Sequence, residues 1–74
     1  MQLHYAIVIE KAPGSSNYSA FVPDLPGCIT TGQTMEEVER LMQEAIEFHL
    51  EGLREDGLPI PEPTTSVAVI EVAA

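Results

Sequence analysis

The stretch from residue 18 to residue 38, Y-S-A-F-V-P-D-L-P-G-C-I-T-T-G-Q-T-M-E-E-V, constrains the fold of this chain more than any other segment. Its β-branched and aromatic residues predict two strands, residues 18–22 and 28–32. Between them, the Pro-Gly pair at residues 26–27 favours a type II turn, because proline fixes φ at the first central position and glycine accepts a positive φ at the second. We also expect the Asp24 carboxylate to accept hydrogen bonds from backbone amides two residues on and so to tighten this corner. The segment specifies shape strongly and offers almost no group that could carry out chemistry.

A helix is predicted to follow directly. Thr34 is a good N-cap, and Glu37, three residues later, completes a capping-box pattern. Gly57 is expected to end the helix as its C′ residue. Apolar residues recur at three- and four-residue spacing and predict one buried stripe: Val38, Leu41, Met42, Ala45, Ile46, His49 and Leu53. The opposite side of this helix is predicted to face water and to be mostly acidic.

The two ends of the chain are predicted to add strands to the same sheet. Residues 3–10 carry apolar side chains on both faces, so we expect a central strand buried on both sides. After the helix, the run L-P-I-P-E-P must be extended, and residues 67–72 are predicted to return as a last strand through a right-handed crossover. The predicted fold class is therefore α+β with the order βββαβ, a three-stranded antiparallel meander plus a fourth strand after one helix. Because one helix covers only one sheet face, we expect the other face to be a dimerisation or partner surface.

Length and composition indicate one small intracellular domain, residues 1–74. A chain of this length buries only about 60% of the surface that its unfolded form exposes, so its core is marginal. Cys28 is the single cysteine, which excludes an internal disulfide, and no Cys/His cluster is present. We therefore expect a homo-oligomer, a dimer or a tetramer, as the remaining means of stabilisation. The N-terminus lacks a basic start and a cleavage site, and a free thiol is typical of the reducing cytoplasm, so a cytoplasmic location without membrane contact is expected.

Charge narrows the choice of partner. Twelve acidic residues against three basic ones give a formal net charge of −9. Nucleic-acid affinity comes largely from Lys and Arg side chains that neutralise phosphates, so this chain is not expected to bind DNA or RNA directly. An acidic surface suits a basic partner, because opposite potentials speed the encounter. The alternative interpretation is that the acidity serves only to keep a small protein soluble.

The residues that could carry chemistry do not form a reactive set. Two-metal phosphoryl chemistry needs several converging carboxylates, and the strands supply only Glu10 and Glu71, both near strand ends. His49 lies in the apolar helix stripe and is interpreted as a core residue, while Cys28 follows a turn with nothing to lower its pKa. We therefore predict no catalytic residue, no metal site and no cofactor, and hence a protein that is not an enzyme.

Three motifs in order, Y-S-A-F-V-P-D-L-P-G-C, T-x-G-Q-T-M-E-E-V and A-I-E-F-H-L-E-G-L-R-E-D-G-L-P-I-P-E-P, resemble those of the HicB-type antitoxin family. The resemblance covers residues 5–63. It implies a partial, degraded ribonuclease H-like fold and a function in binding and neutralising a HicA-type toxin, a small basic ribonuclease that cleaves messenger RNA. Many such antitoxins also carry a C-terminal DNA-binding module; none follows the last predicted strand here, so autorepression is not expected. The alternative is an orphan oligomeric binding module without a toxin partner or catalytic activity.

If a toxin is bound, the one-sided acidic helix predicts the contacts. Opposite charge across an interface accelerates association, so the glutamates on the wet helix side are the first candidates. The predicted partner-binding residues are Tyr18 and Asp24 near the sheet edge, with Glu36, Glu39, Glu44 and Glu47 on the helix. The alternative is that these glutamates only form a solvated helix face.

Overall fold

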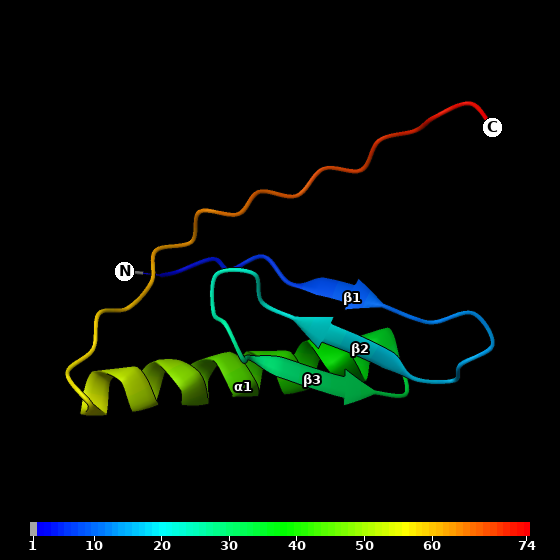
Figure 1. The fold of residues 1–74 in the computed structure, drawn as a ribbon. Helices are drawn as coiled ribbons and strands as arrows, with labels where there is room; N and C mark the ends of the chain where they lie inside the picture. The colour runs from blue at the N-terminus through cyan, green and yellow to red at the C-terminus, as the bar shows by residue number, and fades with distance from the viewer. Residues whose placement is uncertain (1) are drawn as a thin grey trace.

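The computed structural model describes residues 2–74 and has one long helix packed against one face of a small antiparallel sheet (Figure 1). The elements within the described residues are β1 (Val8–Glu10), β2 (Tyr18–Phe21), β3 (Ile29–Gly32) and α1 (Met35–Glu55). Strands pair in the order β1-β2-β3, each antiparallel to its neighbour. The α+β class and the three-stranded meander are thus confirmed.

Two Pro-Gly turns form, at residues 13–14 and at the predicted residues 26–27. The Ser15 amide donates to the Ala12 carbonyl at 3.0 Å, closing the turn in the β1–β2 hairpin. The Cys28 amide donates to the Leu25 carbonyl at 3.1 Å, and Gly27 has a φ of +84°, as the second central position of a type II turn requires. These turns fix the register in which β2 lies between its two neighbours.

The helix begins and ends at the predicted residues. The Thr34 hydroxyl accepts a hydrogen bond from the Glu37 amide at 3.0 Å, and the Glu37 carboxylate accepts one from the Gln33 amide at 3.1 Å. At the other end, the amides of Gly57 and Leu58 donate to carbonyls of the last turn, at 3.1 and 2.9 Å. Gly57 has a φ of +69°, which completes a Schellman motif. Local side-chain chemistry is therefore sufficient to set the length of α1.

The core lies between α1, β2 and the corner that follows β2. Its buried apolar residues are Ala20, Val22, Leu25, Cys28, Val38, Met42 and Leu50. Because α1 covers one face only, successive residues of β2 have opposite environments: Ala20 is buried, whereas Phe21 is exposed. This small core is consistent with the marginal stability expected for a chain of this length.

The prediction of a central first strand was wrong. Strand pairing is limited to Val8–Glu10 within the predicted range 3–10, and β1 lies at the edge of the sheet, paired with β2 alone. Val8 and Ile9 are half-buried rather than buried on both sides. The reason is that no strand flanks β1 on its other side among the described residues.

The expected fourth strand is likewise not formed. Residues 58–74 are extended chain outside the sheet, and beyond Thr65 this chain follows the general direction of β1 while diverging from it (Figure 1). The proline-spaced residues 58–63 are extended, as predicted, but they bring the chain to hydrogen bonds with the β2–β3 corner rather than to the edge of β1. The final segment therefore lacks the neighbour that would make it a strand.

Candidate protein-binding surface

The four helix glutamates predicted as contacts all lie on exposed positions of α1. Glu36 is in the first turn, where the positive end of the helix dipole favours a carboxylate. Glu44 accepts a hydrogen bond from Arg40 at 3.2 Å, and both side chains are well exposed, so this ion pair contributes little to stability. Glu39 and Glu47 are two turns apart on α1, and both lie beside the N-terminal residues 2–7.

Residues 2–7 and α1 border an open groove of about 630 Å³. Its floor is apolar, formed by Leu3, Ile7, Met42, Ile46 and Leu50. Glu39 and Glu47 lie along its helix side, as does one basic residue, Arg54. A long basic side chain suits such a groove, because its aliphatic stem can lie on the floor while its charged head meets the carboxylates. The sequence did not reveal the groove, because residues 3–7 were expected to pair within the sheet and not to line a gap beside the helix.

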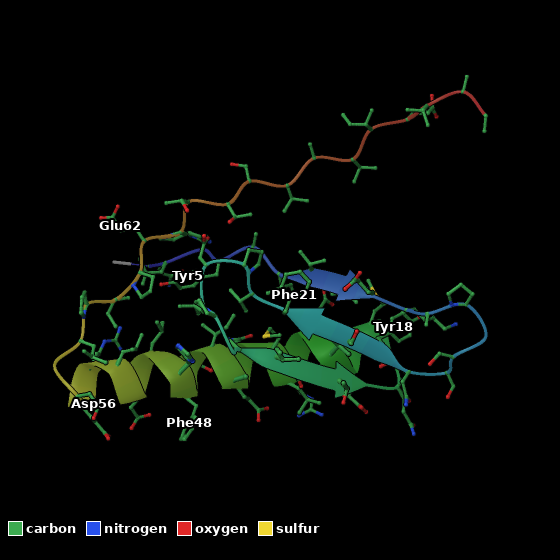
Figure 2. The ribbon with its side chains drawn as sticks, in the orientation of Figure 1. Tyr5, Tyr18, Phe21, Phe48, Asp56 and Glu62 are labelled. Atoms are coloured by element: carbon green, nitrogen blue, oxygen red, sulfur yellow. The ribbon has the colours of Figure 1, made fainter. Side chains whose placement is uncertain are left out.

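Phe48 is a second feature that sequence reasoning missed. Its side chain is 80% exposed and projects from α1 on the side away from the sheet (Figure 2). Together with Ile29, which is 66% exposed, it lines a smaller groove of about 440 Å³ between α1 and the β2–β3 corner. The available signal was its position in the sequence: a phenylalanine outside the apolar stripe of an otherwise acidic helix side.

The sheet face that α1 leaves uncovered carries a row of apolar residues. Val8 is paired with Phe21 across β1 and β2, and Phe21 is paired with Ile29 across β2 and β3. Directly paired residues project from the same face of a sheet, so these three side chains lie side by side. The row is the side of the sheet that α1 leaves bare.

The two remaining predicted contacts lie apart from the groove. Tyr18 is at the hairpin end of β2, half-buried, with the Lys11 ammonium 5.5 Å from its ring centre. Asp24 is in the corner beyond the opposite end of β2. The structure therefore brings Glu39 and Glu47 to one groove and places Tyr18, Asp24, Glu36 and Glu44 elsewhere on the molecule.

Asp24 bonds a distant segment, not the local amides expected for it. Its carboxylate accepts hydrogen bonds from the backbone amides of Thr64 and Thr65, both at 3.1 Å, and from their hydroxyls at 3.0 and 2.9 Å. Partial burial acts to raise the pKa of Asp24, but these four hydrogen bonds outweigh it and hold the pKa below its usual value. We call this arrangement the Asp24 anchor, since it holds the chain that follows the helix against the β2–β3 corner.

Tyr5 provides a second attachment for the same segment. Its hydroxyl donates to the carbonyl of Pro61, and in Figure 2 its ring lies beneath the chain that follows the helix. Burial, followed by the nearby Asp24 carboxylate, raises the pKa of Tyr5, so the phenol keeps its proton and remains a donor. The two contacts together fix the course of residues 61–65.

The groups that could act on a substrate or hold an ion are dispersed. The Cys28 thiol is buried, 3.9 Å from the Met42 sulfur, and burial raises its pKa. Within residues 2–74, no three His, Cys, Asp or Glu side chains are grouped so that they could ligate one metal ion. In the same part of the chain, no helix combines the length and the apolar character needed to cross a bilayer. The organised features of this surface are its two grooves, its carboxylates and its exposed apolar side chains.

Comparison with known proteins identifies the class. The family described as "HicB_like antitoxin of bacterial toxin-antitoxin system" matches residues 5–73. A UPF0150 protein of Helicobacter pylori is 45% identical over 67 residues, covering 89% of this chain and 90% of the relative. A UPF0150 protein of Synechocystis is 33% identical over 69 residues, covering 93% and 86%. The chain belongs to the HicB-like antitoxin family, and the predicted resemblance is confirmed.

A longer relative is found in a bacteriophage. An uncharacterized 14.9 kDa protein from the rep-hol intergenic region of Haemophilus phage HP1 is 43% identical over 58 residues. The match covers 78% of this chain and only 42% of the phage protein. The domain described here thus corresponds to less than half of that relative.

Proposed function

We propose that this chain is the antitoxin of a small basic toxin of the HicA type and neutralises it by binding, without catalysing a reaction. The observation that carries the proposal is the match of the HicB-like antitoxin family to residues 5–73. The net charge of −9 supports it, because a basic ribonuclease and an acidic partner attract each other over several ångströms before contact.

The groove beside α1 is the proposed point of engagement. A lysine or arginine of the toxin would lie on the apolar floor with its charge between Glu39 and Glu47. Glu36, Glu44, Asp24 and Tyr18 would contribute to the acidic surroundings or to the rim of the contact, where charges govern the encounter rate more than the final affinity. A bound basic side chain of this kind would no longer be available to the messenger RNA phosphates.

Further properties complete the proposal. The order of three antiparallel strands followed by a helix supports a partial ribonuclease H-like fold, with residues 67–72 becoming its fourth strand on association. The apolar row of Val8, Phe21 and Ile29 supports a homo-oligomer. The expected location is the cytoplasm, where messenger RNA and its nuclease would meet.

Co-expression tests the function. The chain is produced together with any small basic protein encoded next to it, and the product is analysed by size-exclusion chromatography with mass detection. A stable heterocomplex and restored cell growth are expected. A homo-oligomer alone, with growth still arrested by the toxin, would instead support the orphan binding module, which the exposed apolar row also favours.

A matched pair of charge variants tests the groove. Glu39→Gln combined with Glu47→Gln should slow association with the toxin and flatten its dependence on salt, because two carboxylates at the contact are neutralised. The control, Glu51→Gln with Glu55→Gln, removes the same charge from exposed positions of α1 that do not line the groove. Equal effects of the two double variants in stopped-flow kinetics would show that only net charge matters and that the groove is not the contact.

A further inference from the structure

The last segment of the chain has the composition of a buried strand and the environment of a loose tail. Residues 66–74, S-V-A-V-I-E-V-A-A, carry a single charge, at Glu71. Apolar residues occupy both alternating faces, which is typical of a strand covered on both sides. Yet Val69 is 94% exposed, and Val67, Ile70 and Val72 are also largely in water. An exposed apolar segment of this kind marks a surface that is covered in the functional state.

The same chain presents an unpaired sheet edge. Strand β1 is hydrogen-bonded to β2 on one side, and no strand occupies its other side among residues 2–74. The N–H and C=O groups along such an edge form a ready template for a further strand. The chain therefore contains one strand without a sheet and one sheet edge without a strand.

The attachments of residues 61–65 keep these two features apart. Four hydrogen bonds to Asp24 hold Thr64 and Thr65 at the β2–β3 corner, and Tyr5 holds the Pro61 carbonyl. Prolines at alternate positions 59, 61 and 63 make the preceding residues a stiff, extended connection. From the Asp24 anchor onward, the tail runs away from the body in the general direction of β1 but well separated from it (Figure 1). The tail is therefore not part of its own sheet, although it runs in the same direction as β1, as a parallel neighbouring strand would.

We propose that residues 67–72 of one chain pair with the open edge of β1 in a second copy, and that the second copy returns the same contact. The result is a strand-exchanged dimer in which each sheet gains a fourth strand from its partner. Because each chain supplies one tail and one edge, the contact closes with two-fold symmetry and leaves neither tail nor edge unpaired. The sequence predicts that this strand pairs within its own chain. In the dimer, the same pairing forms between two chains.

A second copy fits the tail better than a basic toxin does. The tail offers one carboxylate in nine residues, so charge complementarity cannot be what it contributes to a contact. It offers apolar area instead, and a chain whose described residues include only seven buried apolar ones needs more of it. The acceptor edge is present on every copy, whereas the acidic groove beside α1 is separate from the tail. The inference concerns the chain alone and does not depend on the toxin.

The first test is the mass of the purified full chain in solution, measured by light scattering over a range of concentrations. A species of twice the chain mass is expected. Ile70→Pro should convert it to the single-chain mass, because proline removes an amide donor and cannot occupy a paired central position. Ile70→Thr, which keeps the β-branched shape, should remain dimeric. Ile70 is exposed in the single chain, so a retained helical circular dichroism spectrum verifies that the body still folds.

The second test locates the contact. A dimer prepared from equal amounts of isotope-labelled and unlabelled chains should give filtered NOEs between the methyl groups of Val69 or Val67 in one copy and residues 8–10 of the other. Three results would overturn the proposal. They are a single-chain mass at all concentrations, a dimer that Ile70→Pro leaves intact, and tail-to-β1 NOEs that occur only within one chain. A dimer insensitive to Ile70→Pro would assign association to the Val8, Phe21 and Ile29 row instead.

Discussion

The corner between β2 and β3 and the C-terminal tail are both apolar segments, yet one is buried and the other is in water. At the corner, Val22, Leu25 and Cys28 lie under the helix and form much of the core. In the tail, Val67, Val69 and Ile70 contact no comparable surface. The difference lies in what surrounds each segment: residues of α1 pack with the corner residues in one core, whereas the Asp24 anchor directs the tail outward. Apolar residues specify a core only where the chain supplies a second layer for them.

The sharpest test of this contrast compares truncations of an apolar side chain in the two regions. Leu25→Ala should cost about 2–5 kcal/mol, because it leaves a cavity in the core. A single core in a chain this short rarely supplies more than about 3–5 kcal/mol, so this variant should be largely unfolded. Val69→Ala, in dilute single chains, should change stability by no more than about 0.5 kcal/mol. Urea titrations measure both; comparable losses would mean that the tail is packed in the monomer.

The turn at the corner provides the next test. Gly27→Val should destabilise the fold by about 1–3 kcal/mol, because its φ of +84° is strained for a β-branched residue although its Cβ would meet no atom. Gly27→Asn is the control, since asparagine tolerates a positive φ. If thermal unfolding showed the same midpoint for the valine variant and the parent chain, the corner would not be the rigid element described here.

The smallest expected effect is local and depends on pH. The pKa of Asp24 in the folded chain is below its ordinary value of about 3.9, so its hold on the tail is complete above about pH 4. That hold is lost as the pH falls through the lowered pKa, when the protonated carboxyl can no longer accept all four hydrogen bonds. The amide resonances of Thr64 and Thr65 should shift in this acid range while those of the β2 core residues do not. Asp24→Asn should show the released positions already at neutral pH, and unchanged amides in that variant would contradict the anchor.

The sequence predicted the elements that depend on near neighbours and missed those that depend on distant ones. The two Pro-Gly turns, Thr34, Gly57 and the apolar stripe of α1 act within a few residues, and each lies where its chemistry requires. The edge position of β1 and the course of the tail depend on Asp24 meeting residues 40 and 41 positions later. Neither hydrophobic periodicity nor a helix-capping pattern can indicate a contact between residues so far apart in the sequence.

The same distinction applies to the candidate site. The exposed glutamates of α1 follow from helical spacing, and the family resemblance followed from motifs that are continuous in the sequence. The groove was missed because it needs residues 3–7 and α1 together, a pairing that depends on where the N-terminal segment lies. Phe48 was missed because periodicity identifies the buried stripe and gives no meaning to an apolar residue outside it.

The most direct test of the central claim, that this domain neutralises a basic toxin by binding it, is a titration of the purified toxin's RNA cleavage with this chain. Cleavage should fall in proportion to the added chain and stop at a fixed molar ratio, because each bound chain inactivates a fixed number of toxin molecules. Glu39→Gln with Glu47→Gln should require more protein to reach the same inhibition. Cleavage that continues undiminished in a large excess of the folded parent chain would contradict the account.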